Sequence, residues 1–216
     1  VDRIRAFALK PRAKDLSFAD RYSFSALKTS GYLALDQAAR RRLAESFFND
    51  SFWYGQQACS SPRLIVWCGT PSQARKASAL FFSELDAAIR GKSFTIDPAA
   101  ALAKKNFVYG AAIDQPITRY RSYGKELSVL SLFGLKGLRR EHCGWGLFFE
   151  ARSGTLEGLA SIVCDKDQTM THFGFAPKEI RSFVQTLNGQ GLNRLVPIGQ
   201  ALSFHRYWDG YYLLQE

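Results

Sequence analysis

A short apolar run that leads straight into a helix start constrains the fold of this chain more than any other feature. The run RLIVWCG fills residues 63–69 between a proline and a glycine, which is typical of a buried strand. Directly after it, Thr70, Pro71 and Gln73 occupy the N-cap, N1 and N3 positions of a capping box. A buried strand followed at once by a helix favours alternating α and β layers.

The same alternation continues along the rest of the chain. Short apolar runs predict strands at residues 146–150, 169–175 and 195–198, and the weakly patterned residues 109–132 have room for one or two more. Helical spacing and helix-start residues predict helices at residues 37–48, 70–91, 99–105 and 177–189, with a helical turn at 155–160. The last helix should bury Ile180, Val184 and Leu187 on its inner face. We therefore expect an α/β fold with a mostly parallel sheet flanked by helices.

The composition is typical of a globular protein in a reducing compartment. Of the 216 residues, 46% are hydrophobic and 22% are charged, and no stretch approaches the roughly 20 apolar residues of a membrane-spanning helix. The first ten residues carry charges and lack the apolar core of a signal peptide. The four cysteines, Cys59, Cys68, Cys143 and Cys164, form no CxxC pair. We expect a cytoplasmic protein without a membrane span.

The charge balance suits an anionic partner but does not locate one. The chain has 29 Lys and Arg against 19 Asp and Glu, which gives a net charge of +10. The positive residues are scattered, so solvated helix and loop surfaces explain them as well as a binding patch does. His142, His172 and His205 stand at no metal-ligand spacing from a second ligand. We therefore expect no bound metal.

One segment carries residues suited to covalent chemistry. Cys59 lies in a turn rich in small residues, between a predicted helix and the strand that begins at Arg63. A thiol in such a turn is exposed enough to react, and Arg63 or backbone dipoles can stabilise its thiolate. Gly55 permits close approach of a substrate, and the amides of residues 58–61 can point at a developing oxyanion. A lone cysteine is more often structural than catalytic, so the pattern by itself leaves both interpretations open.

Several segments together resemble a known family. The segment SFWYGQQACSSPR (51–63) looks like the nucleophile loop of the aldehyde dehydrogenase superfamily, in which Gly-Gln precedes the catalytic Cys and an Arg opens the next strand. More specifically, the chain resembles the long-chain fatty acyl-CoA reductases of the LuxC type, the fatty acid reductase of bacterial luminescence systems. The other segments that carry this resemblance are KDLSFADRYSFS (14–25), DQTMTHFGF (167–175), RLVPIGQALSF (194–204) and YWDGYYLL (207–214).

The resemblance implies acyl transfer and reduction at a catalytic Cys59. Its thiolate would take the acyl group of a long-chain acyl-CoA or an acyl-protein as a thioester, and hydride from NADPH would then release a fatty aldehyde. The main-chain amide of Cys59 would be one oxyanion donor, and an Asn of the nucleotide-binding domain would be the second. The other nucleophile-loop residues implied by the resemblance are Gly55, Gln56, Ser60 and Ser61.

Glu141 is the candidate ligand for the cofactor. In the superfamily a glutamate two residues before a Phe-Gly pair binds the nicotinamide ribose hydroxyls, and Glu141 stands in a comparable place. Cys143 and Trp145 replace the family's Phe and Pro, so a surface glutamate beside two arginines is the competing interpretation. The sequence contains no glycine-rich phosphate loop followed by an acidic residue, and no hydrolytic general-base Glu is visible.

The resemblance also divides the chain and suggests its partners. Residues 1–35 would be a connector from a missing nucleotide-binding domain, residues 36–200 the catalytic α/β domain, and residues 201–216 a C-terminal closing arm. The chain starts with Val1 where an initiator Met is expected, which suggests part of a longer protein. The expected partners are long-chain acyl-CoA, or an acyl-protein synthetase or transferase, and further copies in a full-length homo-oligomer. No nucleic acid is expected.

Two other functions remain open at this point. The chain could serve an aldehyde dehydrogenase that works in the oxidative or CoA-acylating direction. It could instead be a basic, aromatic-rich binding module in which Cys59 is incidental. Selective alkylation of Cys59 separates the enzymes from the binding module, because only an enzyme needs a reactive thiol there.

Overall fold

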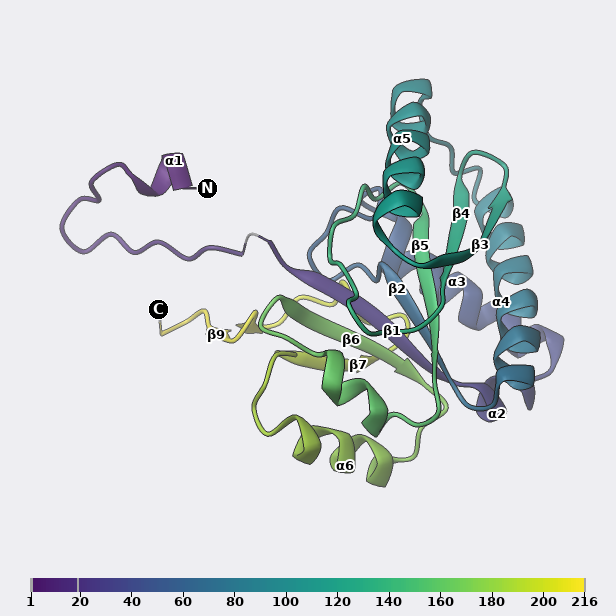
Figure 1. Ribbon diagram of the computed structural model, residues 1–216. Coiled ribbons are helices and arrows are strands. Elements are labelled where there is room, and N and C mark those ends of the chain that lie inside the picture. Colours follow the sequence, from purple (N-terminus) through teal and green to yellow (C-terminus); the bar gives the residue numbers. More distant parts are fainter. Residues whose placement is uncertain (1, 19, 216) are drawn as a thin grey trace.

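A computed structural model describes residues 2–18 and 20–215 and shows a seven-stranded sheet with helices on both faces (Figure 1). The strands of the sheet are β1 (Tyr22–Lys28), β2 (Leu64–Cys68), β3 (Ile117–Tyr123), β4 (Leu127–Leu132), β5 (Leu147–Ser153), β6 (Asp167–Phe173) and β7 (Arg194–Pro197). The helices are α1 (Asp2–Arg5), α2 (Thr29–Leu33), α3 (Gln37–Phe52), α4 (Pro71–Gly91), α5 (Pro98–Asp114), α6 (Pro177–Leu187) and the 3-10 helix η1 (Glu157–Ile162). Near the C-terminus, β8 (Tyr207–Trp208) and β9 (Tyr211–Tyr212) form a separate ribbon.

The sheet is parallel except at one edge. Its strand order is β3-β4-β5-β2-β1-β6-β7, and only the pair β3–β4 runs antiparallel. Five pairs of neighbouring strands are parallel, and the chain returns from β1 to β2 through α2 and α3, from β5 to β6 through η1, and from β6 to β7 through α6. The predicted α/β fold with a mostly parallel sheet is therefore confirmed.

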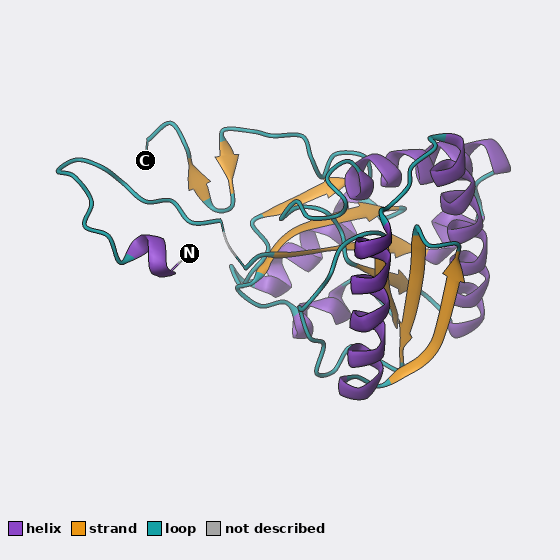
Figure 2. Ribbon diagram, turned by 90° about the horizontal axis from the view of Figure 1, so that it is seen from above, coloured by secondary structure: helices purple, strands orange, loops and turns teal. Residues whose placement is uncertain are grey.

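Two apolar cores hold the layers together, one on each face of the sheet. On one face α2, α3 and α4 pack against the sheet through an aromatic cluster that includes Phe47, Phe81 and Trp67. On the other face α5, η1 and α6 cover the sheet, and Phe149 and Phe183 lie at the centre of that core. Figure 2 shows the two helical layers on either side of the strands. Within the described ranges, none of the helices is long and apolar enough to cross a membrane.

The strand β1 corrects the predicted domain boundary at residue 35. It lies between β2 and β6, so residues 22–28 belong to the middle of the sheet and not to a connector. The sequence hid this strand because Ser23 and Ser25 interrupt its apolar pattern, although both are fully buried. Each hydroxyl is satisfied: Ser23 Oγ donates to the main-chain oxygen of Cys59 at 2.7 Å, and Ser25 Oγ hydrogen-bonds Thr171 Oγ1.

The local signals located most of the other elements. The predicted strands at residues 63–69, 146–150 and 169–175 correspond to β2, β5 and β6. Asp36, Thr70 and Asp97 are the N-caps of α3, α4 and α5, and each side chain accepts a hydrogen bond from the amide three residues on. Helix starts were predictable because each cap is a local interaction within one turn.

Two helices differ from the prediction away from their starts. The helix expected at residues 99–105 continues to the end of α5, because Val108 and Ala111 pack into the core beneath it. In α6, Phe183 and Leu187 are buried, whereas Val184 was expected inside and is 46% exposed. The inner face of α6 is therefore rotated by one residue from the predicted one.

The two ends of the chain lie next to each other beyond the amino end of β1. Figures 1 and 2 show residues 2–18 and the β8–β9 ribbon on the same side of the sheet. Arg21 Nε binds Asp209 Oδ1 at 2.7 Å, and the ring of Phe18 meets that of Tyr211 edge-on. Asp50 accepts hydrogen bonds from the amides of Gly199 (2.6 Å) and Ala201 (2.8 Å), which ties the start of the C-terminal segment to α3.

Removing the capping box of α4 should weaken the fold by a defined amount. Thr70→Ala deletes the oxygen that accepts from the Gln73 amide, and such a loss costs about 1 kcal/mol of unfolding free energy. Urea unfolding followed by circular dichroism measures the difference from wild type. Ser72→Ala is the matched control, since its exposed side chain is in the same turn and should change the unfolding free energy little. Equal effects of the two variants would contradict the capping role.

Candidate active site

Cys59 is partly exposed at the edge of an open cleft. It lies in the loop between α3 and β2, close to the amino ends of β1 and β6. The cleft has a volume of about 320 Å³, and its lining includes Tyr22, Arg63 and His142 besides Cys59. Cys59 therefore has the solvent access that a reacting thiol requires, while its role as a nucleophile stays a prediction.

The side chain of Gln56 fastens the Cys59 loop to the chain segment that enters β5. Gln56 is fully buried; its Nε2 donates to the main-chain oxygens of Pro62 (2.9 Å) and Leu147 (3.0 Å), and its Oε1 accepts from the Gly146 amide at 3.0 Å. The backbone φ of Gln56 is 64°, a left-handed conformation that is strained for residues other than glycine. The three hydrogen bonds of its side chain stabilise the residue in this conformation. Gln56, which the sequence assigned to the nucleophile loop, thus holds the loop in position and does not line the cleft.

Gly55 is required by close packing against the same segment. Its φ is 56°, and a Cβ added there would lie 2.6 Å from the ring of Trp145. Its carbonyl oxygen accepts a hydrogen bond from the Trp145 amide at 2.8 Å. Next to it, Gln57 Nε2 donates to the main-chain oxygen of Cys143 at 2.8 Å. The structure therefore brings the Cys59 loop and the segment after Glu141 together, although 82 residues separate Cys59 from Glu141 in the sequence.

The serines after Cys59 fix the turn from inside. Ser60 and Ser61 are both buried, and Ser61 Oγ donates to the main-chain oxygen of Asp50 at 2.8 Å. The Ser61 amide donates to the Ala58 oxygen at 3.0 Å. In the part of the chain that the structure describes, the amides of Cys59 and Ser60 donate to no protein acceptor. Their role as oxyanion donors, which the sequence suggested, stays a prediction.

Arg63 places a buried positive charge beside the thiol. Its side chain is 2% exposed, and its Nη1 and Nη2 donate to the main-chain oxygens of Arg21 (3.1 Å) and Ala58 (3.0 Å). No carboxylate among the described residues pairs with it, and its Nε has no hydrogen-bond partner there. Burial lowers the pKa of the Arg63 guanidinium, and the neighbouring Tyr22 and Cys59 oppose that shift. A buried cation without a carboxylate partner favours an anion next to it, so a negatively charged group in the Cys59 cleft would be stabilised there.

Gln168 is a site residue that the sequence did not single out. It lies in β6, is 1% exposed, and its Nε2 donates to Cys59 Sγ at 3.4 Å, while its Oε1 has no partner among the described residues. A buried polar run, Asp167-Gln168-Thr169, opens this strand. The polar run is visible in the sequence, but its burial, which requires partners or a ligand for these groups, is visible only in the structure.

His142, which lines the cleft beside Cys59, is uncharged at neutral pH. Burial, followed by the nearby Arg63, lowers the pKa of His142 to about 4, and its Nδ1 has no partner among the described residues. Burial also raises the pKa of Tyr22, whose hydroxyl is likewise buried and unpartnered within the described ranges. Tyr22, Arg63 and His142, which all line the cleft, therefore each have a hydrogen-bonding atom without a partner among the described residues. This arrangement suits a polar ligand group.

Glu141 lies at the surface near the same cleft. It is exposed, and its carboxylate makes no hydrogen bond or ion pair with any described residue. The two arginines before it are engaged elsewhere, Arg139 with Asp114 at 2.9 Å and Arg140 with Asp167 at 2.7 Å. The carboxylate of Glu141 is thus free, and its assignment as a cofactor ligand stays a prediction.

Two of the other three cysteines are less suited to react. Burial raises the pKa of Cys68 to about 12 and that of Cys143 to about 11, so both thiols are protonated at neutral pH. Cys164 is partly exposed and lies after η1, away from the Cys59 loop in the chain. Across residues 2–18 and 20–215, no three His, Cys, Asp or Glu side chains are grouped as a metal site.

The fold is similar to that of aldehyde dehydrogenases of known structure. A search of solved structures matches proline utilization A from Bdellovibrio bacteriovorus with a TM-score of 0.53 and 12% identity over 82% of this chain. Betaine aldehyde dehydrogenase from Staphylococcus aureus matches with a TM-score of 0.55 and 12% identity over 87% of this chain. Delta-pyrroline-5-carboxylate dehydrogenase from Mycobacterium tuberculosis matches with a TM-score of 0.55 and 12% identity over 82% of this chain. The aldehyde dehydrogenase-like fold expected from the sequence is confirmed.

These similarities concern one part of much longer proteins. The chain spans 19% of the proline utilization A protein, 38% of the betaine aldehyde dehydrogenase and 34% of the pyrroline-carboxylate dehydrogenase. No family model matches the sequence, and a search of curated proteins gives no match. The similarity therefore establishes the fold, and the activity has to be argued from the site.

Removing His142 should flatten the pH dependence of stability. Because its folded pKa of about 4 lies below the ordinary 6.5, the unfolded chain takes up this proton first as the pH falls. Titration of His142 therefore removes stability between pH 6.5 and 4, and His142→Gln should lose less stability than wild type over that range. Urea midpoints at several pH values measure this. His205→Gln, which changes an exposed histidine, should keep the wild-type slope, and a wild-type slope in His142→Gln would contradict the analysis.

Cys59 should react first with limiting iodoacetamide, and Gln168 should contribute to its rate. Gln168→Leu removes the N–H that donates to Sγ; loss of a hydrogen bond to a charged sulfur should slow alkylation at pH 7 by roughly tenfold. Peptide mass spectrometry gives the rate for each cysteine. Gln185→Leu on the exposed face of α6 is the control and should react as wild type does. Uniform slow labelling of all four cysteines would rule out an activated thiol.

Proposed function

We propose that this chain is the catalytic domain of a reductase that converts long-chain acyl-CoA or acyl-protein thioesters to fatty aldehydes with NADPH. Cys59 is the nucleophile in this proposal, and the acyl group passes through a thioester on its sulfur. The aldehyde dehydrogenase-like fold supports the proposal at the level of an aldehyde-processing oxidoreductase. The segments that resemble the LuxC type support the narrower assignment to acyl thioesters.

The observation that carries the proposal is the environment of the Cys59 sulfur. One side chain, Gln168, donates a hydrogen bond to it at 3.4 Å, and the buried guanidinium of Arg63 lines the same cleft without a carboxylate partner in the described chain. A hydrogen-bond donor and a buried positive charge close to the sulfur are features of reactive cysteines. A structural cysteine needs neither of them, because a buried thiol is satisfied by apolar packing alone.

The chain's own residues support acyl transfer in two ways. The Cys59 thiolate attacks the carbonyl carbon of the incoming thioester; a new C–S bond forms to Sγ, the old C–S bond breaks, and the leaving thiolate takes a proton from solvent. The free amides of Cys59 and Ser60 stabilise the oxyanion of the tetrahedral intermediate. His142 remains neutral at pH 7 and adds no positive charge beside the thiolate.

The reductive half of the reaction requires a nicotinamide cofactor, which supplies hydride to the acyl carbon when bound. Glu141 fits a role in holding it, because its exposed carboxylate is free of described partners and precedes the segment fastened to the Cys59 loop. The two oxygens of a carboxylate can accept hydrogen bonds from the hydroxyl groups of a ribose. The pyrroline-carboxylate dehydrogenase of similar fold is bound with NAD, and the similar betaine aldehyde dehydrogenase carries a BME-modified cysteine.

The same geometry also serves the oxidative or CoA-acylating direction, since the Cys59 adduct is common to both. The solved betaine aldehyde and pyrroline-carboxylate enzymes of similar fold are named as dehydrogenases, which supports the oxidative direction as a second candidate function. We propose that the acyl donor is acyl-CoA or an acyl-protein synthetase or transferase, and that the full-length protein is a homo-oligomer. Assay of the full-length protein with acyl-CoA and NADPH, and with an aldehyde and NADP, separates the two directions.

Acylation of Cys59 tests the proposed function directly. Incubation with a long-chain acyl-CoA should add the mass of one acyl group to the intact protein, as read by mass spectrometry. Cys59→Ala should abolish the adduct, and Cys59→Ser should reduce it severely, because a serine hydroxyl without an adjacent base is rarely ionised. Without the Asn donor that the resemblance places in the nucleotide-binding domain, the rate falls by about 10²- to 10³-fold, so long incubations are needed.

The control for this experiment is a cysteine outside the cleft. Cys164→Ala should be acylated like wild type, because Cys164 contributes nothing to the Cys59 cleft. An adduct on Cys59→Ala that matches wild type in amount would show that the nucleophile has been misassigned. Absence of any adduct on wild-type protein after long incubation, with intact fold, would also overturn the proposal.

A further inference from the structure

A second groove, with a volume of about 440 Å³, opens between α4 and the β3–β4–β5 part of the sheet. Four arginines line it: Arg75 from α4, Arg119 and Arg121 from β3, and Arg152 from β5. Glu150 is the single acidic residue among its lining residues. The groove therefore carries an excess of positive charge, gathered from three elements that lie far apart in the sequence.

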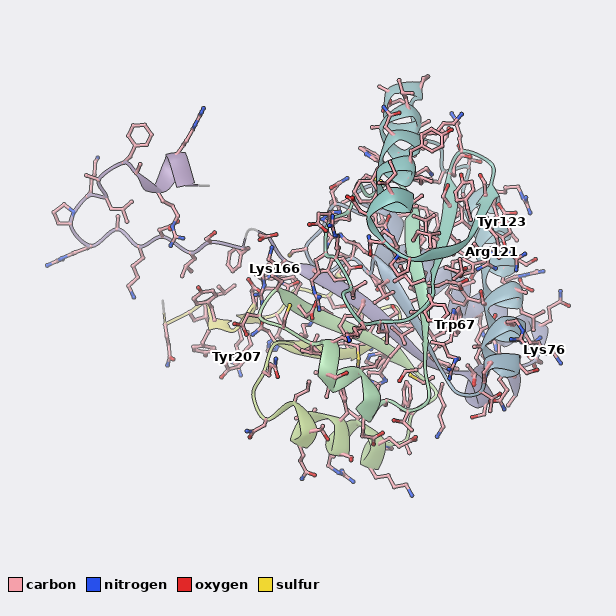
Figure 3. The ribbon with its side chains drawn as sticks, in the orientation of Figure 1. Trp67, Lys76, Arg121, Tyr123, Lys166 and Tyr207 are labelled. Atoms are coloured by element: carbon pink, nitrogen blue, oxygen red, sulfur yellow. The ribbon has the colours of Figure 1, made fainter. Side chains whose placement is uncertain are left out.

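Strand pairing places these side chains on one face of the sheet. Arg119 lies opposite Ser131, Ser131 lies opposite Glu150, and Arg152 lies opposite Trp67. Directly paired residues of neighbouring strands point to the same face. Figure 3 shows Trp67, Arg121 and Tyr123 together on the side of the sheet that faces α4.

The one carboxylate in the groove is already fully engaged. Glu150 is buried and accepts hydrogen bonds from the Trp67 indole (3.0 Å) and from the hydroxyls of Ser78 (2.6 Å) and Ser131 (2.6 Å). It also forms an ion pair with Arg121 at 2.6 Å. This network makes a rigid polar floor, and it neutralises only one of the four guanidinium groups.

The other three arginines have no carboxylate partner among the described residues. Arg75, Arg119 and Arg152 are exposed at the rim, and none of them takes part in an ion pair there. Arginine forks match phosphate oxygens in charge and geometry, and clusters of them are typical of phosphate recognition. Three exposed guanidinium groups thus surround one cavity without a carboxylate partner in the described chain, and such a site suits an anion with several charges.

The position of the groove in the fold is also that of a ligand site. It lies at the carboxyl ends of β2, β4 and β5, where open α/β sheets most often bind ligands, and the first turn of α4 contributes to its lining. The Cys59 cleft lies at the other end of β2, about 16 Å away for a strand of five residues. The groove is therefore separate from the proposed active site.

We propose that this groove binds the phosphate groups of a small phosphorylated molecule. Arg119 and Arg152 hold the phosphate oxygens from the sheet, and Arg75 closes the opposite side from α4. Phe133 lines the same groove, is 84% exposed and offers a flat face to a ring attached to the phosphates. This inference does not depend on the chemistry proposed for Cys59.

Isothermal titration with three probes at low salt tests the proposal. Pyrophosphate and ADP should bind to the whole chain, and citrate, a non-phosphate anion with similar charge, should bind at least about tenfold more weakly. Tighter binding of ADP than of pyrophosphate would assign a contact to the attached ring, and equal affinities would assign binding to the phosphates alone; both results support the site. No heat from either phosphate at millimolar concentration, or citrate binding as tightly, would overturn it.

Variants locate the binding and separate it from the active site. Arg119→Ala combined with Arg152→Ala should weaken pyrophosphate binding by tenfold or more, since it removes two charge-assisted contacts from exposed positions. The matched control is Arg181→Ala, an exposed arginine on α6 on the other face of the sheet, which should bind like wild type. Protein alkylated at Cys59 should also bind like wild type. Unchanged affinity in the double variant, or loss of binding on alkylation, would overturn the assignment to this groove.

Discussion

The position of Cys59 depends on one buried amide side chain. Gln56 satisfies three main-chain groups at once, from Pro62 just before β2 and from Gly146 and Leu147 at the entry to β5. All of these groups lie in the interior, where an unpaired amide or carbonyl costs about 1–3 kcal/mol. Because the same side chain satisfies both segments, the Cys59 loop cannot move away from β5 without leaving several of them unpaired. Gln56 therefore fixes the position of the Cys59 loop relative to β5.

The charges in the molecule are arranged so that two regions are open to anions. At the amino ends of β1, β2 and β6, the buried Arg63 faces Cys59 and has no carboxylate partner in the described chain. At the carboxyl ends of β2, β4 and β5, the exposed arginines of the second groove surround a carboxylate that is already engaged. Part of the positive charge, which looked scattered along the sequence, is thus concentrated at these two ends of the strands. Cross-strand pairing causes this concentration, because it aligns residues that are distant in the chain.

The buried polar residues of the central strands serve the site more than they serve the core. Ser23 in β1 binds both the main-chain oxygen of Cys59 and the amide of Thr169, and Gln168 in β6 reaches the sulfur itself. Apolar side chains at these positions would fill the same space at lower desolvation cost. Their hydrogen bonds instead connect the Cys59 turn to the two strands beside it. The strand β1, which the sequence placed in a connector, is thus one of the two strands that hold the candidate nucleophile in position.

The sequence by itself determined the elements whose signals are local. The caps Asp36, Thr70 and Asp97, the apolar run of β2 and the small-residue turn around Cys59 could all be identified, because each depends on residues within a few positions of one another. Only the tertiary structure decided that β1 lies in the middle of the sheet, that Gln168 donates to Cys59 Sγ, and that arginines of α4, β3 and β5 share a groove. These features depend on strand order and register, which bring together residues separated by tens of positions. No local pattern encodes such pairings, since a serine or an arginine looks the same in the sequence whether its partner is water or a distant strand.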